Sequence, residues 1–488
     1  LAGNITSYTV FARPNAVKDK QHTAHVLSEI FSLDEGELYE DLVSAKVSEL
    51  TVVRRADAAL AEELAAYDLP GVYYARDNTR TYPYGELLCQ VLGFTSTDNE
   101  GLTGLEKYYD KYLAGMDGEI LYDTDLVGVE IEGGNAAYLP ATDGLNVALT
   151  VDKDIQIIAE EAMADAYLIY SPVSAQCIVL DPSNFEILAM VNYPGYDLND
   201  VPREDTDLLN SLTRNRLISD IYEPGSTFKI VTAAANIEEY LQGNASAFSL
   251  SKIFNSSRTR TVDGTTIRCW SNHANGKHSN QTLAEALNNS CNPCFVDIAL
   301  SLGKQTFYDY LESFGFGKNT GIDFSGESQG MLIPESAVRD CDLARIGFGQ
   351  SLAVSALQLA CAGAAAVNGG YYYQPRLVKS ISDDDGNIEE EFSPVLMNRT
   401  VSEEASRTLA SLLEGVVANG SGSKAYIEGY KVGGKTGTAQ KYENGAIASG
   451  KYVSSFLGFF PADDPKYLAL VIVDEPRGAY YGSVVAAP

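Results

Sequence analysis

Positive charge is scarce in this chain of 488 residues. Lys and Arg together number 35, against 66 Asp and Glu residues, which gives a formal net charge of −31 at pH 7. Nucleic acids and anionic membrane surfaces attract clustered positive charge. The composition therefore argues against a nucleic-acid partner and against binding to an acidic lipid surface.

Long apolar runs are also missing. No stretch of about 18 consecutive apolar residues occurs, so no segment of the printed sequence is expected to span a membrane. No signal peptide, internal repeat or low-complexity segment is visible either. The length suits two or three domains.

Cysteine is present in an odd number, which excludes a fully paired set of disulfides in an exported chain. The seven cysteines are Cys89, Cys177, Cys269, Cys291, Cys294, Cys341 and Cys361.

Three short motifs follow one another along the chain: Ser226-Thr-Phe-Lys229, Ser290-Cys-Asn292 and Lys435-Thr-Gly437. Together they supply a serine with a nearby amine, a hydroxyl and amide pair, and a cation on a strand. A serine enzyme that works through an acyl intermediate needs these groups.

Ser-x-x-Lys alone decides little, because the pattern recurs in the chain. It is also found at Ser249/Lys252, Ser301/Lys304 and Ser421/Lys424. Only Ser226 is preceded by the breaker Pro224-Gly225 and followed by a helix-like apolar run. This context predicts that Ser226 lies in the first turn of a buried helix, with Lys229 on the same face.

The other two motifs have their own local signals. Pro293 prevents a simple continuation of the helix-like stretch Leu283 to Asn289, so Ser290 and Asn292 are expected on a connection between helices. The third motif reads as a strand. Alternation then puts Thr436 and Thr438 on one face, and Gly437 allows close approach of another group.

The chain resembles a class B penicillin-binding protein, a D,D-transpeptidase of bacterial wall synthesis, most closely the division and spore-cortex type of Gram-positive bacteria. The likeness covers nearly the whole chain. It rests on the three motifs and on Tyr222 to Lys229, Gly434 to Gln440, Leu180-Asp-Pro, Ile187-Leu-Ala-Met190, Gly347 to Ser351, Arg80-Thr-Tyr-Pro-Tyr84 and Gly101-Leu-Thr-Gly-Leu-Glu106.

An α+β fold is expected, with an antiparallel five-stranded sheet flanked by helices and a mixed N-terminal pedestal domain. Residues 1–148 are expected to form the non-catalytic (dimerisation or pedestal) domain, and residues 149–488 the penicillin-binding transpeptidase domain. Residue patterns predict helices at 24–42 and 155–167 and strands at 145–151, 174–180, 186–192, 454–460 and 467–473, with a turn at Asn444-Gly445.

The resemblance also implies roles for the motif residues. Ser226 would attack the D-Ala–D-Ala carbonyl of a peptidoglycan stem peptide, with Lys229 as base and Ser290 as proton relay. Asn292 would hold the donor peptide, Lys435 would add charge, and Gly437 would belong to the substrate-binding strand. Thr436 and Thr438 would bind the terminal carboxylate, and the backbone N–H groups of Ser226 and Thr438 would hold the oxyanion. β-Lactam antibiotics would acylate the same serine.

Other functions share these motifs. A D,D-carboxypeptidase differs only in using water as the acceptor, and a serine β-lactamase or β-lactam sensor carries the same three motifs. A large N-terminal domain favours the wall enzyme. A division or sporulation scaffold is the alternative from another class, and the intact Ser226/Lys229 pair argues against it.

No cofactor is expected for the chemistry, but Cys and His residues gather around the second motif. Cys269, His278 and Cys291 are candidate zinc ligands, with His273, Cys294 or Asp263 as the fourth. A reversible Cys269–Cys291 disulfide is the second interpretation, and buried thiols with surface histidines are the third.

The family normally carries one N-terminal membrane helix and works at the extracytoplasmic face of the cell membrane. The chain begins at Leu1 and ends at Ala486-Ala-Pro488, so we expect a fragment without its anchor and tail. The expected partners are peptidoglycan stem peptides, β-lactams, other wall-synthesis proteins and a membrane glycosyltransferase of the shape, elongation, division and sporulation family.

Overall fold

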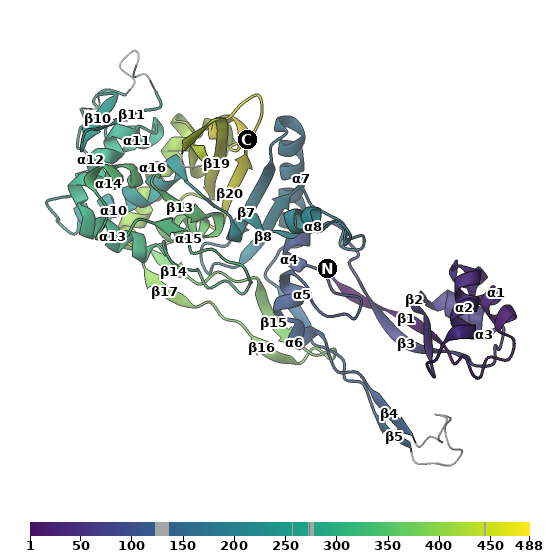
Figure 1. Ribbon diagram of the computed structural model, residues 1–488. Helices are drawn as coiled ribbons and strands as arrows, with labels where there is room; N and C mark the ends of the chain where they lie inside the picture. Colours follow the sequence, from purple (N-terminus) through teal and green to yellow (C-terminus); the bar gives the residue numbers. More distant parts are fainter. Residues whose placement is uncertain (123–135, 256, 272, 274–277, 444–445) are drawn as a thin grey trace.

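The computed structural model describes residues 1–122, 136–255, 257–271, 273, 278–443 and 446–488. An N-terminal head stands on a long ribbon of strands, away from a larger body (Figure 1). The head has an antiparallel sheet in the order β2–β1–β3 with helices packed on it. Its elements are β1 (Gly3–Ala12), α1 (Lys20–Phe31), α2 (Glu35–Ser44), β2 (Leu50–Asp57), α3 (Ala58–Ala65) and β3 (Val72–Thr81).

The expected helix over residues 24–42 was wrong in one respect, because two helices occupy this stretch. Ser32 ends α1 in a left-handed conformation, with φ of +54°. Asp34 then begins α2 by accepting a hydrogen bond from the backbone N–H of Glu37. A side chain that caps a new helix favours this break over one continuous helix.

An antiparallel sheet of five strands forms the centre of the body and confirms the expected α+β class. Its order is β18–β19–β20–β7–β8. The strands are β7 (Ser174–Leu180), β8 (Ile187–Tyr193), β18 (Gly433–Glu443), β19 (Ala446–Phe460) and β20 (Tyr467–Asp474). These bounds confirm the strands expected at 174–180, 186–192, 454–460 and 467–473, whereas the expected turn at Asn444-Gly445 lies outside the described residues.

Both faces of this sheet are covered by helices. Strand β7 is buried along its whole length. Cys177 and Val179 pack in a cluster with α7 (Lys153–Tyr170), and Ile178 and Leu180 belong to the main core on the other side. Alternation along a doubly covered strand explains why β7 is apolar at each of its last four positions, Cys177 to Leu180. The main core contains residues of α10 (Lys229–Leu241), α15 (Ala356–Val367) and α16 (Glu403–Asn419).

Shorter elements join these layers. Strand β6 (Asn146–Leu149) pairs with β15 (Val378–Ser382), so residues on both sides of position 148 contribute to the packing of the body, and the boundary at 148/149 stays a prediction. The remaining elements are α4 (Cys89–Leu92), α5 (Gly104–Tyr108), α6 (Asp110–Leu113), β4 (Glu119–Tyr122), β5 (Ala136–Leu139), β6 (Asn146–Leu149), α8 (Thr206–Thr213), α9 (Arg216–Ser219), β9 (Ile221–Tyr222), β10 (Thr259–Val262), β11 (Thr265–Arg268), α11 (Leu283–Asn288), α12 (Asn292–Leu302), α13 (Lys304–Ser313), β12 (Met331–Leu332), α14 (Asp340–Ile346), β13 (Leu352–Ser355), β14 (Tyr371–Tyr373), β16 (Ile388–Glu391), β17 (Leu396–Arg399) and α17 (Gly482–Val485).

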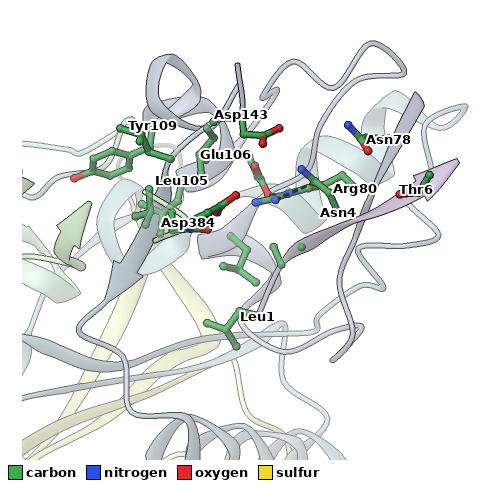
Figure 2. A pocket seen from close by; sticks show the side chains of 18 of the residues that line it. Leu1, Asn4, Thr6, Asn78, Arg80, Leu105, Glu106, Tyr109, Asp143 and Asp384 are labelled. Carbon is green, nitrogen blue, oxygen red and sulfur yellow. Dashed lines mark hydrogen bonds and ion pairs between the residues drawn. The ribbon is translucent and has the colours of Figure 1, made fainter. Parts of the chain in front are cut away.

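A cavity of about 1620 Å³ lies where the ribbon meets the body (Figure 2). Arg80 and Glu106 line it and form an ion pair of 2.7 Å, in which the Glu106 side chain is only 5 % exposed. Only glycine fits at position 101, since a Cβ there would lie 2.1 Å from the carbonyl oxygen of Glu106. Both Arg80 and Glu106 come from segments singled out in the sequence, and they join the ribbon to the body. Across the described ranges, no helix combines the length and apolarity needed to cross a membrane.

Candidate active site

The first motif lies where a tight turn leads into a buried helix. Residues Gly225–Phe228 form the 3₁₀ turn η1, and α10 begins at Lys229. Gly225 adopts a φ of +57° and donates its N–H to the carbonyl of Gly349 at 2.9 Å. Ser226 is therefore placed one turn before the regular helix, close to the expected position, and its side chain stays partly exposed.

Lys229 connects the first motif to the second. Its fully buried side chain puts Nζ 3.0 Å from Ser226 Oγ, 3.1 Å from Ser290 Oγ and 2.8 Å from Asn292 Oδ1. The carbonyl of Ser290 lies 2.9 Å away as well. Burial lowers the pKa of Lys229 to about 8, because the charged ammonium loses its hydration.

The second motif occupies the connection between α11 and α12. Ser290 has a φ of +52°, in the left-handed region that non-glycine residues rarely adopt. Asn292 is the first residue of α12, with Pro293 in the first turn, where the absence of an N–H costs nothing. Asn292 Nδ2 donates to the carbonyl of Arg268 at 3.2 Å, which fixes the amide with its oxygen toward Lys229.

The third motif lies on β18, at the edge of the five-stranded sheet. Lys435 is fully buried, and burial lowers its pKa well below the ordinary value, with the nearby Lys229 charge acting in the same direction. A Cβ at Gly437 would lie 3.0 Å from both the carbonyl oxygen of Pro224 and the Cγ2 of Thr227. Glycine at this position therefore lets β18 contact the nucleophile segment.

The two threonines of β18 have different partners. Thr438 Oγ1 accepts a hydrogen bond of 2.9 Å from the N–H of Gly482 at the start of α17, so its own proton is available to a ligand. Thr436 Oγ1 donates to Ser421 Oγ at 3.3 Å. Ser421 and Gly482 were not predicted as site residues, because neither belongs to one of the three motifs.

The structure thus brings Ser226, Lys229, Ser290 and Asn292 into direct contact. The strand of the third motif completes the site from the other side, since a Cβ at Gly225 would lie 3.3 Å from the carbonyl oxygen of Thr438. One hydroxyl lies beside an amine of lowered pKa, and a second hydroxyl lies within hydrogen-bond distance of the same amine. This arrangement is suited to nucleophilic attack with proton transfer.

A second cluster lies directly behind the second motif. The ligand atoms of Cys269, His273, His278 and Cys291 all lie within 4.8 Å of one another. The two sulfur atoms are 4.0 Å apart, and each has a histidine nitrogen at 3.8 or 3.9 Å. A tetrahedral zinc site with usual bond lengths places its ligand atoms roughly 3.4 to 3.8 Å apart. The observed spacings are somewhat wider, so the four side chains would draw together slightly to bind such an ion.

Three residues were candidates for the fourth zinc ligand: His273, Cys294 and Asp263. Of these, only His273 belongs to the cluster. Asp263 instead accepts a hydrogen bond from the N–H of Cys341. Cys294 Sγ accepts one from Gln281 Nε2 at 3.8 Å and is not part of the cluster.

Two family models match the chain. Residues 175–488 match the penicillin-binding protein transpeptidase domain, and residues 1–149 match the penicillin-binding protein dimerisation domain. These matches cover most of the chain.

Individual relatives agree with the family models. The chain is 39 % identical to stage V sporulation protein D of Bacillus subtilis, over 100 % of this chain and 74 % of the relative. It is 29 % identical to the peptidoglycan D,D-transpeptidase FtsI of Escherichia coli, over 90 % of this chain and 70 % of the relative. Among solved structures, a peptidoglycan synthetase from Bifidobacterium adolescentis has a TM-score of 0.78 at 25 % identity, over 100 % of this chain and 91 % of that one. The chain belongs to the class B penicillin-binding proteins.

Proposed function

We propose that this chain is a peptidoglycan D,D-transpeptidase that crosslinks wall stem peptides through an acyl-enzyme on Ser226. The contact that supports the assignment is the hydrogen bond of 3.0 Å between Lys229 Nζ and Ser226 Oγ. A lysine with a pKa of about 8 is neutral in roughly a tenth of the molecules at pH 7, and this neutral form can accept a proton. Residues 149–488 would carry this chemistry, and residues 1–148 would form the pedestal.

In the acylation step, Ser226 Oγ attacks the carbonyl between the two terminal D-Ala residues, and its proton passes to Lys229 Nζ. The bond to the terminal D-Ala then breaks, and Ser290 relays the proton from Lys229 to the departing amine, which leaves Lys229 neutral again. Asn292 holds the donor peptide backbone. In the second step, an amine of another strand attacks the ester and loses its proton to Lys229. Lys229 returns this proton to Ser226 Oγ as the ester bond breaks, which restores the free serine.

The third motif binds and polarises the donor in this scheme. The backbone N–H groups of Ser226 and Thr438 hold the oxyanion, and each such donor contributes about 3 kcal/mol to the lowering of a barrier. Thr438 faces the terminal carboxylate and Thr436 belongs to the same binding subsite, with Lys435 adding positive charge and Gly437 allowing close approach. No cofactor takes part in these steps.

Intact-protein mass spectrometry with benzylpenicillin tests the assignment. We expect one stable adduct on the wild-type chain and none on Ser226→Ala, because β-lactams acylate the nucleophile and leave slowly. Ser249→Ala is the matched control, since Ser249 also heads a Ser-x-x-Lys pattern but is not expected to react. An adduct that persists on Ser226→Ala would contradict the proposal.

The rival functions give other outcomes in the same experiment. Rapid loss of the adduct with turnover of the drug would identify a β-lactamase. Release of D-Ala from a pentapeptide without formation of a crosslink, in the presence of an amine acceptor, would identify a carboxypeptidase. Failure of any adduct to form, in a folded protein, would favour a scaffold.

We also propose that Cys269, His273, His278 and Cys291 bind one zinc ion with a structural or regulatory role. The support is that their ligand atoms all lie within 4.8 Å of one another, and that two thiols and two imidazoles are ligands that zinc prefers. Cys291 stands between Ser290 and Asn292 in sequence, so an ion held there would fix the backbone that carries both. The reversible Cys269–Cys291 disulfide is the alternative, favoured by the sulfur separation of 4.0 Å.

Elemental analysis of the purified chain distinguishes these interpretations. We expect about one zinc per chain, lost in Cys291→Ser and kept in Cys294→Ala, whose thiol lies outside the cluster. Less than about 0.2 zinc per wild-type chain would contradict the zinc proposal. Mass spectrometry after thiol alkylation would then show whether the disulfide forms.

The site of action and the protein partners are further parts of the proposal. The catalytic part would work at the extracytoplasmic face of the membrane, held by an N-terminal membrane helix outside the printed sequence. A membrane glycosyltransferase is the expected partner of the N-terminal head, on which Tyr39, Val43 and Val47 are large apolar side chains left exposed. Val43→Glu should weaken co-purification with that enzyme without affecting penicillin acylation.

A further inference from the structure

Ser421 is a third serine at the candidate active site, in addition to Ser226 and Ser290, and its sequence context did not indicate this position. It heads one of the Ser-x-x-Lys patterns, but Lys424 is exposed and Ser421 instead accepts a hydrogen bond from Thr436 of the third motif, at 3.3 Å. The residue lies in the turn that follows α16, just before the 3₁₀ turn η3 (Ser423–Ala425).

The turn holds Ser421 in place between the second and third motifs. The N–H of Ser421 donates to the carbonyl of Asn288, the last residue of α11, at 2.9 Å. The N–H groups of Gly420 and Gly422 both donate to the carbonyl of Val416. A Cβ at Gly420 would lie 2.8 Å from Asn288 Cα, so this turn packs so closely against the end of α11 that a side chain at position 420 would not fit.

The number of hydroxyl protons decides which group can bind a ligand. Each hydroxyl has one proton to donate. Thr436 donates its proton to Ser421 and is only 7 % exposed. Ser421 is more exposed, and its own Oγ–H donates no hydrogen bond within the described ranges. Ser421 therefore holds the proton that this pair of hydroxyls can offer to a group in the cleft.

We propose that Ser421 is a substrate-binding residue that donates its hydroxyl proton to the terminal carboxylate of the donor peptide, with Thr436 polarising it from behind. A hydroxyl that accepts one hydrogen bond becomes a better donor of the next. Hydrogen bonds to an ionised acceptor are the stronger kind, so the pair distinguishes a carboxylate from a neutral end group. This inference rests on the proposed transpeptidase function.

The test compares two small thioester donors that differ only at the end group, a free carboxylate in one and its methyl ester in the other. The measured quantity is the second-order rate constant for acylation of Ser226. In Ser421→Ala we expect about a tenfold loss with the acid and little change with the ester. Ser421→Thr should restore the reaction with the acid, because it returns the hydroxyl.

Ser423→Ala is the matched control, since Ser423 lies two residues further along the same turn and its side chain is exposed. It should leave both rate constants unchanged. Equal losses of Ser421→Ala with the acid and the ester would show a structural effect and overturn the inference, as would no loss with either. Failure of the wild-type chain to react with both donors would contradict the proposed function itself and is therefore a distinguishable result.

Discussion

Lys229 Nζ lies 3.0 Å from Ser226 Oγ, in a side chain that is fully buried. Four oxygen atoms surround this nitrogen within 3.1 Å, whereas an ammonium group has only three protons to donate. An ammonium group therefore cannot donate to all four oxygens at once, and once the amine is neutral its lone pair can accept the proton of Ser226.

The rate of acylation by benzylpenicillin should depend on pH through Lys229. Burial lowers the pKa of Lys229 from 10.5 to about 8, so the fraction of neutral amine increases as the pH rises through about 8. We expect the second-order rate constant to rise over this range and to level off above it. Stopped-flow measurements between about pH 6 and pH 9.5 check this, and a flat profile would argue against Lys229 as the base.

Gly437→Ala should slow acylation, because the added Cβ has no space. It would lie 2.4 Å from Ser455 Oγ and 3.0 Å from the carbonyl oxygen of Pro224, so β18 would move away from the nucleophile segment. A shift of this kind is expected to cost on the order of 10- to 100-fold in rate. Gly415→Ala is the control, since a Cβ there makes only an ordinary contact of 3.5 Å with Asn288 Oδ1. Equal rates for the wild type and Gly437→Ala would contradict the packing described here.

Trp270 should report on the Cys/His cluster. It is the only tryptophan of the chain, its indole ring lies 5.9 Å from that of His278, and its Nε1–H donates to the carbonyl of Asn289. If zinc occupies the cluster, a chelator should shift the intrinsic fluorescence of the wild type and leave Cys291→Ser unchanged. A shift of equal size in both proteins would show that the signal does not come from the cluster.

Arg80→Ala should destabilise the junction between the ribbon and the body. The change leaves the buried Glu106 carboxylate without its ion-pair partner, and such losses typically cost about 3 to 5 kcal/mol. Arg54→Ala removes an exposed ion pair with Asp98 and should cost less than about 1 kcal/mol. Thermal unfolding of the two variants compares them, and equal melting temperatures would contradict a structural role for the Arg80–Glu106 pair.

Local patterns in the sequence predicted the elements that have strong periodicity. The helix α7 and the hairpin of β7 and β8 follow from apolar spacing and from the turn at Asp181-Pro182, and the structure has them within a few residues of the expected bounds. The break at Ser32 was not predictable in this way, because serine carries no signal for a left-handed conformation. It is fixed by the competing cap at Asp34.

The candidate site likewise has residues that local patterns predicted and residues that they did not. The three motifs indicated Ser226, Lys229, Ser290, Asn292 and Lys435, because in each short motif the residue types and their spacing match the groups that the chemistry needs. The roles of these residues stay predictions. The contact of Ser421 with Thr436 and the choice of His273 over Asp263 depend on how separate loops fold against α11, and no local pattern reports such a contact.

The strand order of the central sheet has a consequence for biosynthesis. Strand β20 lies between β19 and β7, so residues 467–474 join the hairpin of β18 and β19 to the hairpin of β7 and β8. The nucleophile at position 226 leaves the ribosome more than 200 residues before this joining strand does. A nascent chain therefore has its reactive serine long before it has the strand that joins β18 and β19 to the rest of the sheet, and it gains the ability to react with wall precursors or penicillin only after residue 474 has been made.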